Sequence, residues 1–188
     1  MSGSDTIRIL GISGSLRRSS FNSAALRAAA ELAPAGMSIE IHDIGDLPLY
    51  NDDVRAAGFP APVAALREKI KAADGLLFAT PEYNYSTSGV LKNAIDWASR
   101  PPEQPFDGKP VAIMGASPGA LGTARAQYQL RQCFIFLNAH ILNRPEVMIG
   151  GAGSKFDAEG KLTDAETREH LGKFMVGLAA WVKKLKAA

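Results

Sequence analysis

Hydroxyl, amide and guanidinium side chains gather directly after the first apolar run of the sequence. The stretch ILGISGSLRRSSFNSAAL, residues 9–26, passes from apolar residues into glycine, serine and arginine, and then into an alanine-rich run. Its polar members include Ser13, Ser15, Arg17, Ser19, Ser20 and Asn22. N–H groups at a helix start favour an anion, and hydroxyl and guanidinium groups complete its hydrogen bonds. We therefore expect a terminal monophosphate here, although a plain turn with Ser20 or Asn22 as N-cap would use the same residues.

Two later segments of similar composition also follow apolar runs. PEYNYSTSG, residues 81–89, follows LLFAT and carries two tyrosines and an asparagine. SPGALG, residues 117–122, follows PVAIMGA. Aromatic and amide groups beside a phosphate suit a planar heterocycle whose edge needs hydrogen bonds. The three segments together favour a ligand with a flat ring and one phosphate.

Alternating strands and helices are expected to position these loops. We expect strands over residues 6–12, 38–43, 76–80, 110–116 and 140–142, and helices over 20–32, 62–72, 90–98, 121–137 and 164–186. The links 44–60 and 143–160 read as irregular. This pattern predicts one domain, residues 1–188, of the α/β class, with a doubly wound parallel sheet in three layers. In such sheets ligands bind beyond the carboxyl ends of the strands, where all three loops fall.

Several other kinds of site are excluded by spacing. The first loop contains neither G-x-G-x-x-G nor a G-K-[ST] ending, so dinucleotide and P-loop sites of those types are not expected. His42, His140 and His170 lack metal-ligand spacing, and we expect no metal. Low-molecular-weight phosphatase chemistry would need C-x5-R, but Ala139 is the sixth residue after Cys133.

Composition and charge limit the partners. The 188 residues are 46% hydrophobic and 21% charged, with a formal net charge of +2, which is typical of a globular protein. The basic residues are spread along the chain, which argues against nucleic acid or a membrane surface as a partner. The single Cys133, which we expect to be a buried thiol, excludes an internal disulfide, and the N-terminal residues show no export signal. We expect a cytoplasmic protein.

Three motifs in order resemble one family. GSLRRSSFN, PEYNYSTSGVLKNAIDW and SPGALGTARAQYQLRQ together are similar to the NADPH-dependent FMN reductase family, and most of all to its chromate- and quinone-reducing branch. The resemblance covers nearly the whole chain. It implies a flavodoxin-like sheet of order 2-1-3-4-5, bound FMN, NADPH or NADH as hydride donor, and oligomers whose flavin sites lie near a subunit interface.

The resemblance also implies a set of binding residues. The phosphate loop corresponds to Ser15, Arg17, Ser20, Phe21 and Asn22, and the flavin-ring loop to Pro81, Glu82, Tyr83 and Asn84, with Ser117 and Gly119 flanking the ring. Tyr83 and Tyr85 would form walls of the substrate slot. No catalytic side chain is required, since FMN carries the chemistry. We expect Glu82 to serve through its main-chain amide, with its carboxylate turned away, although a role as proton donor stays open.

The expected reaction is hydride transfer from NAD(P)H to the flavin, followed by transfer to an acceptor in the same slot. Small acceptors such as quinones, azo compounds, ferric chelates and chromate could all approach it. Preference for NADPH would depend on whether an arginine such as Arg17, Arg18 or Arg100 meets the 2′-phosphate. The alternatives are a flavodoxin-type electron carrier without its own turnover, and a non-enzymatic nucleotide-binding module.

We also expect self-association into a homodimer or a homotetramer. The helices over 90–98 and 121–137 would form the contacts. Arg125 and Tyr128, three residues apart, share one helix face. Glu146 of a partner chain is a candidate counter-charge for Arg125, with a solvated surface pair as the alternative.

Overall fold

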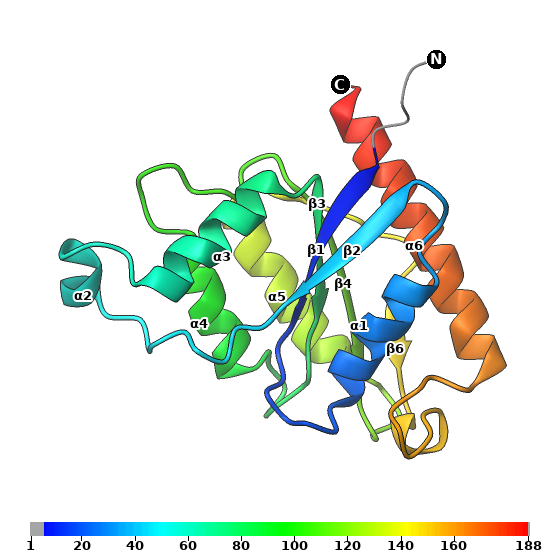
Figure 1. Ribbon diagram of the computed structural model, residues 1–188. Helices are drawn as coiled ribbons and strands as arrows, with labels where there is room; N and C mark the ends of the chain where they lie inside the picture. Colours follow the sequence, from blue (N-terminus) through cyan, green and yellow to red (C-terminus); the bar gives the residue numbers. More distant parts are fainter. Residues whose placement is uncertain (1–5, 188) are drawn as a thin grey trace.

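A parallel sheet forms the centre of the molecule. The structure, a computed structural model, describes residues 6–187. Its strands are β1 (Ile7–Ser13), β2 (Met37–His42), β3 (Gly75–Ala79), β4 (Pro110–Ala116), β5 (His140–Ile141) and β6 (Val147–Ile149). The strand order β2-β1-β3-β4-β5 confirms the flavodoxin-like arrangement (Figure 1). Every residue of β3 and β4 is buried, which explains why these two strands are continuous apolar runs.

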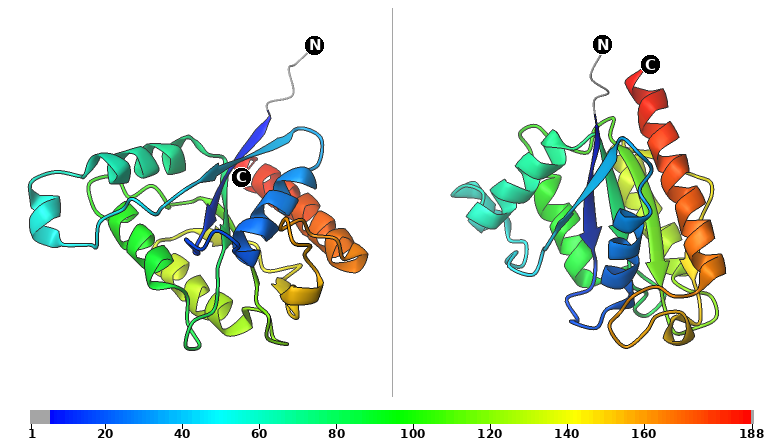
Figure 2. Two further views of the ribbon diagram at one scale, coloured as in Figure 1. Left: turned by 60° about the horizontal axis from the view of Figure 1, so that its bottom comes forward. Right: turned by 45° about the vertical axis from the view of Figure 1, so that its right-hand side comes forward.

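Helices cover both faces of the sheet. Helices α1 (Phe21–Glu31) and α6 (Ala165–Lys186) pack on one face, and α3 (Ala61–Ala72), α4 (Gly89–Ala98) and α5 (Ala124–Phe136) pack on the other (Figures 1 and 2). Each face has its own apolar core. The first contains Leu26, Met114 and Phe174, and the second contains Phe78, Leu91 and Phe134. The predicted three layers are thus present.

Two parts of the chain differ from the prediction. The fifth sheet position is shared by two short strands, because β5 pairs with Pro110 and Val111 while β6 pairs with residues 114–116 of β4. We expected an irregular segment where β6 lies, since three residues are too few to show a pattern. The link after β2 contains a short helix, α2 (Asp52–Ala56), which has no buried residue and projects from the body (Figure 1). A helix without a buried face shows no apolar periodicity.

The helix after β4 begins later than expected. Residues 121–123 form a turn, and α5 starts at Ala124. Other boundaries agree within one or two residues, which is the normal uncertainty of helix and strand ends. A 3-10 turn, η1 (Ala152–Ser154), follows β6, and an antiparallel bridge between Phe156 and Leu162 closes a small hairpin, residues 156–162.

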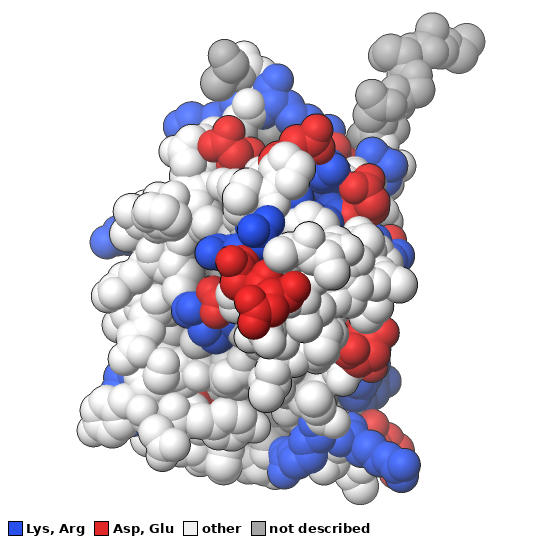
Figure 3. Space-filling model, turned by 90° about the vertical axis from the view of Figure 1, so that its left-hand side faces the viewer, with Lys and Arg blue, Asp and Glu red and all other residues white. Residues whose placement is uncertain are grey.

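The carboxyl ends of β1, β3 and β4 meet at one edge, the lower edge in Figure 1. The loops that follow these strands are the first loop (residues 14–20), the second loop (80–88) and the third loop (117–123). Figure 3 shows basic side chains at this lower edge and mixed charges elsewhere on the face that it presents. No helix within residues 6–187 is long and apolar enough to cross a membrane, and the same residues contain no cluster of three side chains suited to a metal.

Candidate active site

The first loop presents free donors at the start of α1. Ser20 is the N-cap, and its side chain accepts a hydrogen bond of 3.2 Å from the N–H of Ser23. Within the described residues, the N–H groups of Phe21 and Asn22 have no acceptor. The guanidinium of Arg17 donates to the carbonyl of Ser19 at 2.8 Å and lies 5.6 Å from the Phe21 ring. Free N–H groups, hydroxyls and an exposed guanidinium therefore surround the positive end of the helix dipole, as an anion requires.

Asn22 has a second, structural task. Its side-chain amide donates to the carbonyl of Ala116 at 3.0 Å and accepts from the N–H of Ala116 at 2.8 Å. These bonds join the first turn of α1 to the end of β4, 94 positions along the chain. The Asn22 side chain is buried and both of its polar groups are satisfied. Of the polar groups of Asn22, only the backbone N–H is left without a partner among the described residues. The expected contact between Asn22 and a phosphate is therefore limited to that N–H.

The tip of the second loop is a tight two-residue turn. Tyr83 and Ser86 exchange two backbone hydrogen bonds of 3.0 Å, and the residues between them, Asn84 and Tyr85, have φ angles of 51° and 67°. Positive φ at both central positions defines a type I′ turn, in which asparagine is favoured at such positions. The turn leaves Tyr83 and Tyr85 exposed by 53% and 65%. Two aromatic rings thus stand beside the strand ends, as the slot requires, while the Tyr83 N–H is already bonded within the turn.

The Glu82 carboxylate points away from the loop tip and towards α5. It accepts hydrogen bonds from the N–H groups of Arg125 and Ala126 at 3.0 and 3.2 Å, and its other oxygen lies 2.8 Å from Nε of Arg125. The guanidinium carbon of Arg125 lies 3.9 Å from the centre of the Tyr85 ring. Thr123, the N-cap of α5, makes no side-chain cap bond. Glu82 therefore caps α5 although it lies 43 positions earlier in the sequence. Its carboxylate is turned away from the loop tip, as we expected.

The third loop is held by its own hydrogen bonds. The hydroxyl oxygen of Ser117 accepts from the N–H of Gly119 at 3.0 Å, and the N–H of Ser117 donates to the carbonyl of Ile149 at 3.0 Å. A Cβ atom at Gly115, at the end of β4, would collide with the Thr123 hydroxyl and the Thr80 carbonyl. The second and third loops consequently lie against each other with no room for a side chain between their bases.

The first and second loops are also joined. The Ser88 hydroxyl caps α4 through the N–H of Leu91 and donates to the carbonyl of Gly14 at 2.6 Å. A Cβ atom at Gly14 would lie 3.0 Å from Pro81 and from the Ser88 hydroxyl. Sequence reasoning missed Ser88, although a serine directly before an apolar helical run is an N-cap signal. It also missed Thr123, whose packing against the end of β4 cannot be read from local pattern. The three predicted loops therefore form one rigid platform.

A cavity of about 630 Å³ opens beside the first loop, between it and the end of β2. Ser13, Ser15 and Arg17 line one side, and His42 and Asp46 line the other. Burial lowers the pKa of His42, and nearby Lys69 lowers it further, so the imidazole is neutral at pH 7. The cationic groups next to the free N–H groups are thus the arginines of the first loop.

One further expectation is wrong and another stays a prediction. Arg125, which we expect to meet Glu146 of a partner chain, contacts Glu82 and Tyr85 of its own chain, and Glu146 lies 3.8 Å from Arg131 of the same chain. The pairing between chains remains a prediction. The Cys133 thiol, expected to be buried, is only partly buried, and burial raises its pKa. Tyr128 is 51% exposed, as a surface role requires.

Comparison with known proteins agrees with this architecture. The family model described as NADPH-dependent FMN reductase matches residues 7–154. An NAD(P)H-dependent FMN reductase of Pseudomonas aeruginosa is 63% identical over 183 residues, covering 97% of this chain and 99% of the relative. A quinone reductase of Escherichia coli is 45% identical over 186 residues, covering 97% of this chain and 99% of the relative.

A solved structure supports the same assignment. The FerB flavoenzyme, an NAD(P)H:(acceptor) oxidoreductase from Paracoccus denitrificans, superposes with a TM-score of 0.86 at 37% identity, over 94% of this chain and 97% of that one. The family model covers well over half of the sequence, and both relatives align over almost their whole length. The chain belongs to the NADPH-dependent FMN reductase family.

Proposed function

We propose that this chain is an FMN-dependent NAD(P)H:quinone oxidoreductase, with residues 1–188 forming one flavin-binding domain. The observation that carries the proposal is the rigid platform of three loops at the carboxyl ends of β1, β3 and β4, in a chain of this family. The first loop offers free donors for a phosphate, and the other two offer aromatic and main-chain groups for a flat ring. Two relatives are named for the reactions combined here, FMN reduction and quinone reduction.

The first loop would hold the FMN phosphate. The N–H groups of Phe21 and Asn22, the hydroxyls of Ser15 and Ser20 and the guanidinium of Arg17 supply the donors. Their number suits a monophosphate at a helix N-terminus. Arg17 is exposed and forms no ion pair within the described residues, so it is free to turn from the Ser19 carbonyl to an anion.

The second and third loops would hold the flavin ring. FMN, when bound, supplies the two-electron chemistry that links NAD(P)H to the quinone. Pro81, Glu82 and Asn84 contribute main chain on one side, and Ser117, whose hydroxyl proton is free to be donated, and Gly119 contribute the other. Tyr83 and Tyr85 then wall a slot in which donor and acceptor stack in turn. NAD(P)H and the quinone therefore exclude each other, because both need the same face of the flavin ring.

Steady-state kinetics on protein whose flavin has been identified by mass tests this function. We expect FMN, turnover with a benzoquinone, and parallel double-reciprocal lines when NADH or NADPH is varied at several quinone concentrations. Intersecting lines would refute the shared slot. Bound FMN with only slow oxidation of free NAD(P)H would instead indicate an electron carrier. Azo compounds, ferric chelates and chromate are further candidate acceptors for the same slot.

We further propose that the chain self-associates through the outer face of α5, with α4 beside it. Leu121, just before α5, and Tyr128 and Ile135 within it recur every seven positions and are exposed by 58%, 51% and 73%. Phe136 next to them is 88% exposed. An apolar stripe of this length on one helix face is typical of a protein interface. Ile135→Glu should lower the mass measured by light scattering, and a monomeric wild type would refute the proposal.

The cytoplasm is the compartment that we propose, since the sole cysteine forms no disulfide and suits a reducing environment.

A further inference from the structure

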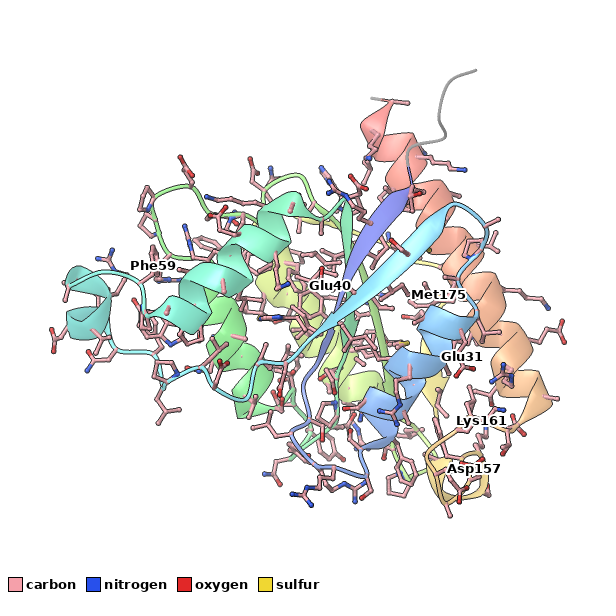
Figure 4. The ribbon with its side chains drawn as sticks, viewed as in Figure 1. Glu31, Glu40, Phe59, Asp157, Lys161 and Met175 are labelled. Atoms are coloured by element: carbon pink, nitrogen blue, oxygen red, sulfur yellow. The ribbon has the colours of Figure 1, made fainter. Side chains whose placement is uncertain are left out.

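A second cleft is lined in part by the phosphate loop itself, through Arg17, Ser20 and Phe21. It has a volume of about 380 Å³ and lies between the start of α1 and the hairpin 156–162. Figure 4 labels Asp157 and Lys161 on this hairpin, beside the first turns of α1. We call it the arginine cleft, because its lining includes the side chains of Arg17, Arg18 and Arg27. None of the residues assigned to the flavin ring contributes to it.

The charges in the arginine cleft are only partly balanced. Within residues 6–187, none of the three guanidinium groups forms an ion pair with a carboxylate. Asp157 and Glu159 line the opposite wall. The Asp157 carboxylate already accepts the N–H of Lys161 at 2.7 Å and thereby stabilises the hairpin turn. Arg18 and Arg27 therefore face the Asp157 and Glu159 carboxylates, and Arg17, which we place at the flavin phosphate, adds a third cation to the lining.

The shape of the cleft is set by packing and by hydrogen bonds within the chain. The rings of Phe21 and Phe156 pack together at a centroid distance of 5.4 Å. Gly160, with φ of 77°, brings the hairpin so close that a Cβ atom there would lie 3.1 Å from Nη2 of Arg27. Arg168 ties the far end of the hairpin, donating to the carbonyl of Leu162 at 3.0 Å. A residue with a side chain at 160 would be strained by this positive φ and would displace the end of the Arg27 side chain.

The hairpin is also connected to the flavin-ring side of the platform. The segment that leads into it donates from Gly151 to the carbonyl of Gly119 and from Ala152 to the carbonyl of Ser117, both at 3.1 Å. The cleft and the ring loops consequently belong to one continuous rim at the carboxyl ends of the strands. A ligand that stacks on the ring with one end could follow this rim with the other.

We propose that the arginine cleft binds the 2′-phosphate of NADPH and so sets the preference for NADPH over NADH. This inference rests on the proposed function. A phosphomonoester is close to a dianion at pH 7, and guanidinium groups bind it bidentately. NADH lacks this phosphate and would leave the cationic groups without a partner. The Phe21 ring, which lines the cleft and packs on the buried Phe156 ring, offers an apolar surface for the adenine that carries the phosphate.

The test compares Arg18→Ala, Arg27→Ala and the double variant with wild type. We expect each single change to lower the ratio of kcat/KM for NADPH to that for NADH about five- to thirtyfold, and the double change to lower it further, since these exposed groups each contribute a solvent-screened contact to a doubly charged ligand. Raising the salt concentration should weaken NADPH use more than NADH use. Lys161→Ala is the matched control, because it removes one positive charge from the same hairpin outside the cleft.

Binding measured without turnover separates this inference from the proposed function. Titration calorimetry of the holoprotein with adenosine 2′,5′-bisphosphate and with adenosine 5′-diphosphate should show a preference for the 2′-phosphate that Arg27→Ala removes. A preference retained in the double variant, or a ratio unchanged from wild type, would overturn the assignment. An equal loss of FMN affinity in Arg27→Ala would also overturn it, because the cleft would then serve the flavin phosphate. Absence of quinone turnover with both donors, with 2′-phosphate binding intact, would refute the proposed function alone.

Discussion

Removing the Glu82 carboxylate should lower the stability of the protein measurably and leave quinone turnover almost unchanged. Two N–H groups in the first turn of α5 depend on this side chain, at 3.0 and 3.2 Å, and no other cap is present. Loss of a helix cap costs about 0.5–2 kcal/mol, and loss of a charge next to the helix dipole about 0.3–1 kcal/mol. The ion pair to Arg125 adds little, because the Arg125 side chain is 36% exposed.

The expected cost of Glu82→Ala is therefore about 2 kcal/mol, or a fall in Tm of roughly 4–8 °C for a chain of this size. Glu82→Gln should cost about half as much, since the amide oxygen can still accept one of the two N–H groups. Urea denaturation of the flavin-loaded protein, followed by circular dichroism, measures both values. Glu68→Gln is the control: its side chain is 71% exposed and pairs with Lys71, so a change below about 0.5 kcal/mol is expected.

Quinone turnover of the same variants decides between the two roles that the sequence left open for Glu82. A capping carboxylate predicts that Glu82→Gln keeps turnover within a few-fold of wild type at every pH. A carboxylate that donates a proton predicts the opposite pattern, with normal stability and a loss of a hundredfold or more. That second pattern would show that the side chain leaves α5 during the reaction, and the reasoning above would be wrong.

Three further predictions follow from the hydrogen bonds and contacts around the platform. Arg17→Ala should weaken FMN binding about tenfold to a hundredfold, the effect of a lost charged hydrogen bond of about 1.5–3 kcal/mol; unchanged affinity by fluorescence titration would exclude Arg17 from the phosphate site. Although burial opposes it, hydrogen bonds from the Arg8 N–H and Lys186 hold the pKa of Asp74 below its usual value. Asp74→Ala should therefore cost stability at pH 7, and the difference from wild type should shrink as pH falls through that lowered pKa; urea titrations at pH 7 and 3 that gave equal differences would contradict this. Gly115→Ala should destabilise by about 2–4 kcal/mol, because the new methyl group meets the Thr123 hydroxyl and the Thr80 carbonyl, and a Tm within 2 °C of wild type would mean that the two loops can separate.

The alternation of buried strands and helices could be predicted because it depends on local pattern, whereas the strand order was implied by the resemblance to the family. Residues 76–80 and 110–116 read as buried strands, and each is followed by a loop rich in turn residues. Once the strands are parallel, their carboxyl ends must share an edge, so the three loops come together without knowledge of any contact. Tyr83 and Tyr85 are exposed, as walls of a substrate slot would have to be. Both belong to a type I′ turn, which projects from the end of a buried strand.

The missed features depend on contacts between distant parts of the chain. Nothing near Asn22 in the sequence indicates that its amide bonds to Ala116, and nothing near Arg125 indicates that Glu82, 43 positions away, is its partner. The expected pairing of Arg125 with Glu146 of a partner chain stays a prediction, since helix spacing shows which residues share a face but not which charges of its own chain a residue also meets. Strand β6 and helix α2 were missed because each is short and lacks the periodic burial that marks longer elements.

The polar residues of the candidate site therefore divide into those that hold the platform together and those that stay exposed. Asn22, Glu82 and Ser88 use their side chains on the backbone of another loop or helix, and each keeps two elements in register. Arg17, Arg18 and Tyr85 are exposed, and neither arginine forms an ion pair within residues 6–187. A substitution in the first group should change stability and flavin affinity together, because it moves whole loops. Substituting Arg18 or Tyr85 should change the affinity for one substrate and leave the Tm almost unaltered, whereas substituting Arg17 should weaken FMN binding without moving a loop. This separation is what a rigid site with interchangeable substrates requires.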